Sequence, residues 1–205
     1  VGIGKAAGKY LSTGTGNTIL GAAAGDALQG GDDNIFIGGG AGGATTAGGN
    51  IICVGVGAGA AVMTSDADGS IFVGTNTGAG GTAIGYFAGK MNLSGISSTF
   101  LGWKSGPQTP SAKLTGDHNT CVGAEAGGDI RAAGHSNTFV GSQAGLATQT
   151  GVENTCLGFN ADIEDATATN QIVIGNNITG TKDNAVFIGN DSSHIENDYN
   201  ADATW

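Results

Sequence analysis

One short pattern recurs from the beginning of the sequence almost to its end. An aliphatic residue, a glycine, two variable residues and Ala-Gly follow one another in stretches such as NTILGAAAG (17–25) and NTFVGSQAG (137–145). Repetition at a fixed short period is typical of a solenoid, in which each repeat forms one coil that packs on its neighbours. The glycine after the aliphatic residue occurs at twelve positions, mostly 17 residues apart: Gly4, Gly21, Gly38, Gly55, Gly74, Gly85, Gly102, Gly123, Gly141, Gly158, Gly175 and Gly189.

Each repeat begins with residues that favour a β-strand. The segment Asn/Ser-Thr-x-Ile/Val/Leu-Gly is rich in β-branched residues and is bounded by turn residues. The Ala-Gly that follows predicts a tight corner, because glycine adopts conformations that other residues avoid. Stacked coils pair each strand with its successor, so we expect an all-β fold, a glycine-rich parallel β-solenoid of about twelve coils over residues 1–191. Residues 192–205 break the repeat and are expected to form a non-repeat tail.

The predicted strands carry apolar residues on both faces. Neighbouring side chains of a strand point to opposite faces, so Thr138 and Val140 share one face and Phe139 takes the other. A coil of a single chain needs only one buried face. The pattern therefore predicts that each strand is covered twice, most simply by other copies of the chain. The position of Phe139 holds a series of apolar residues: Ile19, Phe36, Cys53, Phe72, Ala83, Phe100, Cys121, Phe139, Cys156, Val173 and Phe187.

Composition limits the classes of protein to which the chain can belong. Glycine accounts for 41 of 205 residues, while charged residues are 12% and aromatic residues 6% of the chain, a mixture that suits closely packed backbones. The net charge of -10 and the lack of a basic cluster disfavour binding to nucleic acid or to an anionic membrane. No run approaches 18 apolar residues, so no membrane insertion is predicted.

The first residues also match the glycine fingerprint of a dinucleotide-binding turn, Gly2-x-Gly4-x-x-Gly8. That fingerprint requires a following helix, and AAGKYLSTGTG is too short and too rich in glycine to form it. GYFAGKM (85–91) resembles a phosphate loop, but Met91 replaces the required Ser or Thr. We therefore interpret these glycines as corners of a coil and predict no cofactor.

Cysteine and acidic residues do not predict a reactive site. Cys53, Cys121 and Cys156 take the repeat position of Phe, so we interpret them as small buried hydrophobic residues without an intrachain disulfide. SDADGS (65–70) and GGDDN (30–34) resemble calcium loops, but the acids do not recur in register; solvated turns are expected, and an occasional bound Ca²⁺ stays open. No Ser-His-Asp arrangement and no spaced carboxylate pair stands out, so no metal site and no enzymatic activity are predicted.

Candidate contact residues lie where the repeat is least uniform. The longest returns between strands are 59–69 and 106–118, and variable loops carry recognition more often than a uniform rod does. Three further candidates follow the repeat glycine where other copies have small residues. Packing under a neighbouring loop is the alternative role for these three residues. The candidates for contact with a receptor are Tyr86, Trp103, Lys104, Lys113 and His118.

The repeated Asn-Thr-x-Val-Gly-x-x-Ala-Gly resembles the head repeats of trimeric autotransporter adhesins of the YadA type and the related repeats of bacteriophage tail fibres. The resemblance covers about residues 1–191. It implies a left-handed parallel β-roll in which three chains pack about a threefold axis. The sequence departs from that family in its longer repeat and in the Phe or Cys that often stands where the family commonly has Ala.

The C-terminal GNDSSHIENDYNADATW looks like the segment before an endosialidase-type intramolecular chaperone, which in phage tail fibres assembles the trimer and then cleaves itself off. Together the resemblances imply a structural fibre or adhesion protein of a virion or a cell surface. Such a protein would be a rigid homotrimeric shaft or head that positions or contacts a host-surface glycan or protein receptor. The alternatives are a bacterial surface adhesin of the trimeric autotransporter type and, from another class, a polysaccharide-degrading tailspike.

Overall fold

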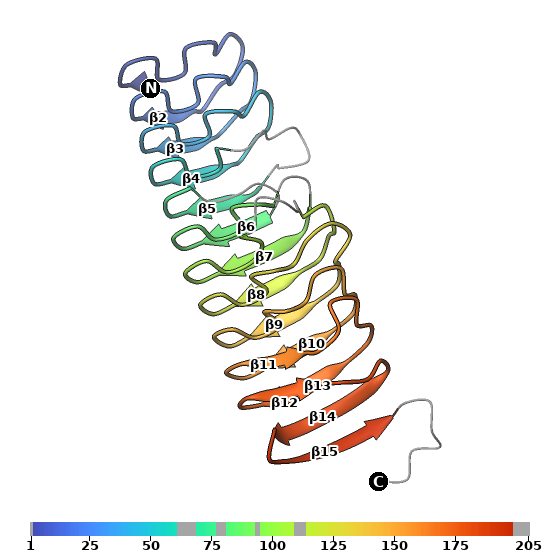
Figure 1. The fold of residues 1–205 in the computed structure, drawn as a ribbon. Coiled ribbons are helices and arrows are strands. Elements are labelled where there is room, and N and C mark those ends of the chain that lie inside the picture. The colour runs from blue at the N-terminus through green and yellow to red at the C-terminus, as the bar shows by residue number, and fades with distance from the viewer. Residues whose placement is uncertain (1, 61–68, 77–80, 93–94, 109–113, 199–205) are drawn as a thin grey trace.

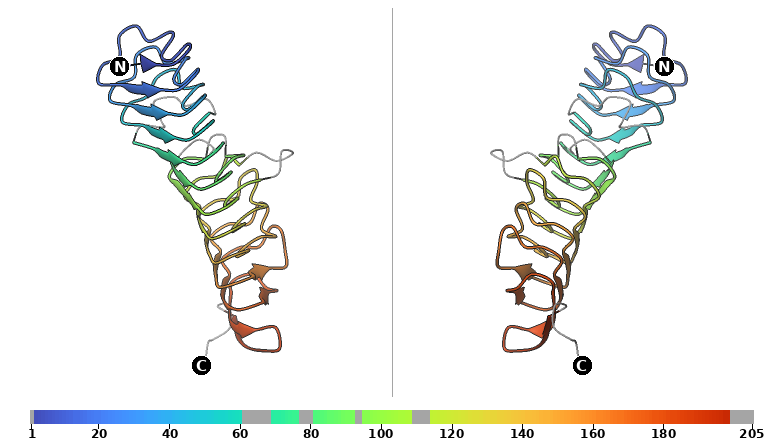
Figure 2. Two further views of the ribbon diagram at one scale, coloured as in Figure 1. Left: turned by 90° about the vertical axis from the view of Figure 1, so that its left-hand side faces the viewer. Right: turned by 90° about the vertical axis from the view of Figure 1, so that its right-hand side faces the viewer.

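The computed structural model describes residues 2–60, 69–76, 81–92, 95–108 and 114–198. They form an elongated rod of stacked coils, with the first and last described coils at opposite ends of the rod (Figure 1). Figure 2 shows that the axis of this rod is curved rather than straight. The strands are β1 (Gly2–Ile3), β2 (Thr18–Leu20), β3 (Ile35–Ile37), β4 (Ile52–Val54), β5 (Ile71–Val73), β6 (Gly81–Ile84), β7 (Ser98–Leu101), β8 (Thr120–Val122), β9 (Thr138–Val140), β10 (Thr155–Leu157), β11 (Ala161–Ile163), β12 (Ile172–Gly175), β13 (Ile178–Gly180), β14 (Ala185–Asn190) and β15 (Ser193–Asp198).

One sheet of thirteen strands runs the length of the rod. Its order is β1-β2-β3-β4-β5-β6-β7-β8-β9-β10-β12-β14-β15, and neighbours from β1 to β14 are parallel. β11 and β13 form a second, two-stranded parallel sheet. No helix occurs in the ranges that the structure describes. The predicted all-β fold, a parallel β-solenoid, is therefore confirmed.

The solenoid has about ten turns rather than the twelve coils predicted. All twelve repeats supply a parallel strand to the large sheet, but twelve strands enclose at most eleven turns. In addition, the interval from Gly74 to Gly85 is much shorter than the dominant 17-residue repeat. Counting repeat glycines therefore overestimates the number of full turns.

The central residue of each strand fills the interior of the rod. The residues at the Phe139 position, from Ile19 to Phe187, are all at most 2% exposed. Large and small side chains alternate along much of this column, since the register pairs Phe36 with Cys53 and Cys53 with Phe72. Adjacent strands lie only about 4.8 Å apart, so a ring on every coil would overfill the interior. The alternation of Phe with Cys or Ala thus fits the available space.

The repeat glycines turn the chain at the end of each strand. All twelve have positive φ, between +130° and +149°, which favours glycine. The repeat glycines of successive coils also lie directly against one another. A Cβ added to Gly102, for example, would lie 2.5 Å from the carbonyl oxygen of Gly123. Gly4 and Gly8 of the N-terminal fingerprint take the same corner positions in the first coil, at φ +136° and +59°.

A ladder of buried side-chain amides explains the asparagine that opens many repeats. The backbone N–H and the side-chain amide of Asn154 both donate to Oδ1 of Asn137, at 3.1 and 3.2 Å. Nδ2 of Asn137 in turn donates to the Gly151 carbonyl at 2.8 Å. The same contacts join Asn17 to Asn34 in the N-terminal coils. Each asparagine thereby satisfies backbone groups that the interior of a coil would otherwise leave unpaired.

An antiparallel strand covers the C-terminal edge of the sheet. β15 lies within residues 192–205, which were predicted to be a non-repeat tail, and it pairs with β14 along its whole length. On the side of the sheet that Phe187 faces, β15 presents His194, Glu196 and Asp198, and Asp198 forms an ion pair with Lys182. A further apolar coil could not pack on these polar residues, so β15 ends the solenoid.

Candidate functional site

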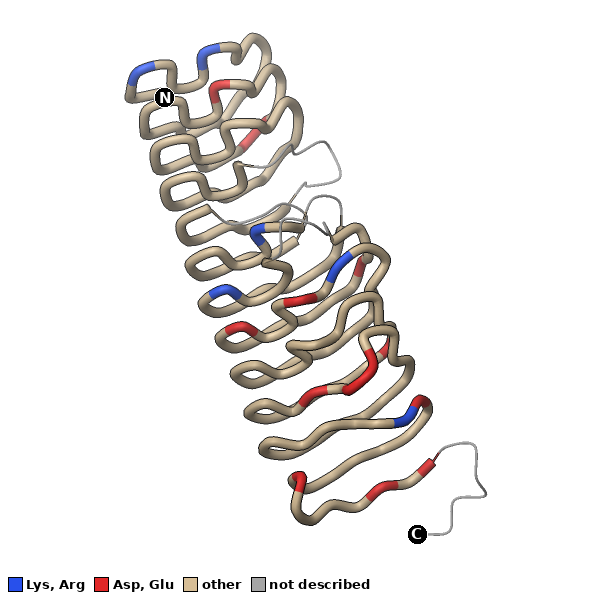
Figure 3. The backbone as a smooth tube through the Cα atoms, viewed as in Figure 1, with Lys and Arg blue, Asp and Glu red and all other residues tan. Residues whose placement is uncertain are grey.

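The outer face of the thirteen-stranded sheet is uncharged, and a row of aliphatic side chains runs along it beside threonines such as Thr138. None of its parallel strands contains a charged residue, and the acidic and basic residues coloured in Figure 3 belong to other parts of the coils and to β15. The residue before the repeat glycine points away from the core, as Leu20 (45% exposed), Leu101 (43%) and Leu157 (45%) illustrate. An apolar face of this length is unusual on a monomer. It corresponds to the second apolar face of the predicted strands.

Two neighbouring coils carry aromatic side chains at a corner next to this face. Tyr86 and Trp103 follow the repeat glycines of β6 and β7, and each is 47% exposed. Tyr86 stacks on Phe87, with ring centroids 4.1 Å apart. Nζ of Lys90 lies 4.0 Å from the centroid of Phe87, and Nζ of Lys104 lies 4.3 Å from that of Trp103. We call these five residues the aromatic corner.

A shallow cavity of about 230 Å³ opens beside the aromatic corner. Lys104 belongs to both, and Oε2 of Glu125 in the cavity wall accepts a hydrogen bond from Gln143 at 3.1 Å. Of the predicted candidates, the structure therefore brings Tyr86, Trp103 and Lys104 together. The cavity is lined by Lys104, Gln108, Glu125, Gly128, Asp129 and Leu146.

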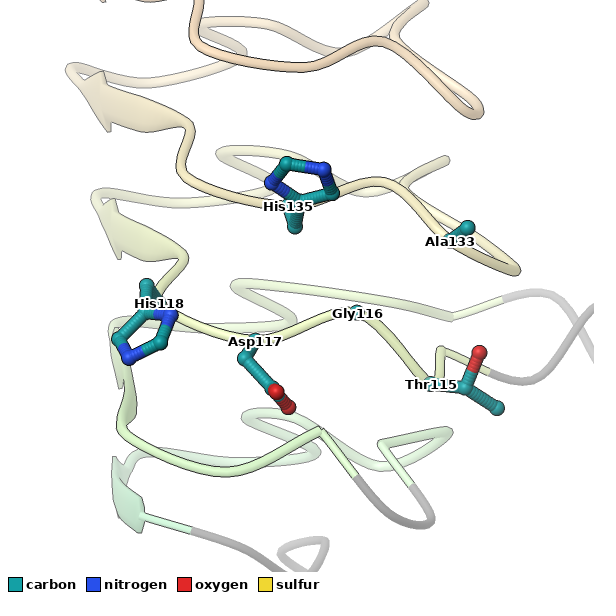
Figure 4. Close-up of a pocket in the computed structure, with 6 residues that line it drawn as sticks. All are labelled: Thr115, Gly116, Asp117, His118, Ala133 and His135. Atoms are coloured by element: carbon teal, nitrogen blue, oxygen red, sulfur yellow. The ribbon is translucent and has the colours of Figure 1, made fainter.

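His118 lies in a different place, on the connections that lead into the strands. It precedes β8 with φ +59°, and it lines a polar cavity of about 260 Å³ with His135 from the next coil (Figure 4). Oδ1 of the neighbouring Asp117 accepts a hydrogen bond from the Ile96 N–H at 2.8 Å. His118 and His135 belong to the connections that precede the successive strands β8 and β9. The sequence signal for their proximity is the 18-residue interval between the repeat glycines Gly123 and Gly141, because it places the two loops at equivalent points of successive repeats.

The structure also bears on the possible metal site and on the three cysteines considered in the sequence analysis. Among the described residues, no group of three or more His, Cys, Asp or Glu side chains could hold a metal ion. Lys113 and residues 65–68 of SDADGS lie outside the described residues. The three cysteines are free and buried, and burial raises the pKa of the Cys53 thiol to about 12 and raises those of Cys121 and Cys156 as well. Phe139 separates Cys121 from Cys156 in the sheet.

Asp162 is an acidic residue in β11, at a repeat position where most repeats have glycine. Its carboxylate accepts hydrogen bonds from the backbone N–H of Ala147 (3.1 Å) and of Ile163 (2.9 Å). Burial raises the pKa of Asp162 to about 6, an effect that these hydrogen bonds reduce and the nearby charge of Asp129 increases. Compared with the unfolded chain, the folded protein therefore favours the protonated form of Asp162.

We expect the stability that Asp162 contributes to be lost as the pH rises. Its folded pKa is raised, so the contribution is complete below about pH 4 and declines as the pH passes through about 6. The melting temperature of Asp162→Asn minus that of the wild type should thus increase from pH 4 to 7, measured by circular dichroism. Asp165→Asn is the control with the opposite trend, because hydrogen bonds from Thr167 lower the pKa of Asp165. A pH-independent difference for Asp162→Asn would contradict the assignment.

Comparison of the chain with protein-family models, with curated proteins and with solved structures finds no match. In the part of the chain that the structure describes, no helix has the length and apolar character needed to cross a bilayer.

Proposed function

We propose that this protein is a structural fibre or adhesion protein. Three copies of the chain form a rigid shaft or head, as in a phage tail fibre or a bacterial surface adhesin, which positions or contacts a receptor on a host surface. It belongs to a virion or to a cell surface. Binding to nucleic acid and membrane insertion are not part of this function.

The observation that carries the proposal is the uncharged outer face of the sheet. Leu20, Leu101 and Leu157 lie in β2, β7 and β10, so the apolar surface extends along the rod rather than forming a local patch. Burial of apolar surface contributes about 25 cal/mol per Å², and the gain adds up along the rod. Copies placed side by side would provide the second cover that the sequence predicts. The number three comes from the likeness of the repeat to trimeric adhesin heads.

The molar mass in solution tests this proposal. Sedimentation equilibrium of the wild type is expected to give three times the chain mass of 19.9 kDa. A well-folded monomer would contradict the proposal. Release of oligosaccharides from a host capsular polysaccharide would also contradict it, because turnover favours a tailspike enzyme.

A further inference from the structure

The aromatic corner differs from the other large exposed side chains at the same repeat position. Val56 (61% exposed) and Phe159 (49%) also follow a repeat glycine. Each stands alone, however, because the preceding and following coils have Gly, Thr, Ser or Asn at that position. Tyr86 and Trp103 lie on paired coils, since Ile84 pairs with Leu101 and the Lys104 N–H donates to the Tyr86 carbonyl at 2.8 Å. Two exposed aromatic side chains therefore occupy the same repeat position on adjacent coils.

The surroundings of the aromatic corner are charged, unlike the face of the sheet. Lys90 and Lys104 lie over its rings, and Glu125 and Asp129 line the cavity beside it. Charged residues are depleted from the centres of protein interfaces, where their desolvation is costly. The aromatic corner is thus suited to a hydrated ligand rather than to the interface between copies.

The chemistry of this surface matches a sugar. A pyranose ring has a face of C–H groups that packs on an aromatic ring and an edge of hydroxyl groups that donate and accept hydrogen bonds. Carboxylates of Glu125 and Asp129 can accept from hydroxyl groups, and the ammonium group of Lys104 can donate to them. Adjacent coils are about 4.8 Å apart, comparable to the length of one sugar residue. Tyr86 and Trp103 can therefore contact consecutive residues of a glycan that lies along the rod.

The net charge of the chain disfavours an acidic glycan. At the site itself the charges offset one another, because Lys90 and Lys104 lie over the rings while Glu125 and Asp129 line the cavity. Asp129 is also paired with Arg131 at 3.8 Å. The whole chain, however, has a net charge of -10, so a glycan with carboxylate or sulfate groups would be repelled at long range. A neutral glycan avoids this repulsion.

We propose that the aromatic corner and its cavity bind a neutral pyranose glycan through Tyr86, Trp103 and Lys104. This inference rests on the proposed function, to which it adds the chemical class of the receptor. It assigns stacking to Tyr86 and Trp103 and hydrogen bonding to Lys104, Glu125 and Asp129.

Binding to immobilised oligosaccharides tests the proposal. The wild type is expected to bind members of a panel of neutral gluco-, galacto- and manno-oligosaccharides and to bind their sialylated or uronic-acid counterparts more weakly. Trp103→Ala is expected to weaken binding about tenfold, and Tyr86→Ala/Trp103→Ala to abolish it, because stacking supplies much of the contact. Val56→Ala and Phe159→Ala are the matched controls and should bind like the wild type.

The outcomes separate this proposal from the proposed function. Wild-type protein that binds none of the neutral oligosaccharides overturns the glycan site, whatever its mass in solution. Equal binding by the wild type and Tyr86→Ala/Trp103→Ala overturns it too, as does preference for the acidic members of the panel. If the double variant instead loses its oligomeric mass, the aromatic corner belongs to the interface between copies. The proposed function fails on the mass of the wild type alone.

Discussion

The variant Leu20→Glu/Leu101→Glu/Leu157→Glu is expected to be a folded monomer. Each of these side chains is more than 40% exposed in the single chain, so a carboxylate there remains largely hydrated and costs the fold little. In an oligomer that buries the outer face, each copy would instead bring three charges into the interface. Desolvation costs several kcal/mol per buried unpaired ion. Sedimentation equilibrium should therefore show the mass of a single chain, with the far-ultraviolet circular dichroism of a β-protein retained.

The matched control replaces the same three leucines by methionine. Methionine keeps the apolar character and approximate volume of leucine, so this variant should keep the oligomeric mass of the wild type. If the glutamate variant also keeps that mass, the outer face is not the interface and the proposed function loses its main support.

Gly38→Ala is expected to destabilise the protein severely, whereas the adjacent Gly39→Ala is not. Gly38 has φ +131°, and a Cβ there would lie 2.5 Å from the carbonyl carbon of Gly55 and 3.1 Å from the amide nitrogen of Val56. Backbone strain and steric overlap together should lower the free energy of unfolding by about 3 kcal/mol or more. Urea denaturation at one protein concentration measures the change, since the stability of an oligomer depends on concentration.

Gly39 provides a control one residue away. Its φ is not in the left-handed region, and the nearest atom to an added Cβ is the Ala22 carbonyl oxygen at 3.8 Å. Gly39→Ala should thus unfold within about 0.5 kcal/mol of the wild type. Similar stability of the two variants would show that the coils do not stack glycine on glycine.

The site depends on features that the sequence shows only in part. Tyr86, Trp103 and Lys104 stand out as exceptions to a small-residue position, so they could be selected from the repeat itself. Glu125 and Asp129 could not, because their nearness to Lys104 depends on how a 21-residue coil stacks on the next coil. The cavity of His118 and His135 depends on stacking in the same way. Loop residues outside the repeat have no period from which their partners can be predicted.

By itself, the sequence determined that the chain forms a parallel β-solenoid with glycine corners. A period of two within each strand and a period near 17 along the chain fix the strands, their order and their register, because every repeat has strand-forming and turn-forming residues at the same positions. Only the tertiary structure decided which of two apolar faces is inside and how the stack ends. The Phe139 column faces inward because its rings pack on corner glycines such as Gly127 and Gly145, which leave room for them. β15 reverses direction, and no repeat specifies that reversal, since it depends on pairing with the exposed edge of β14.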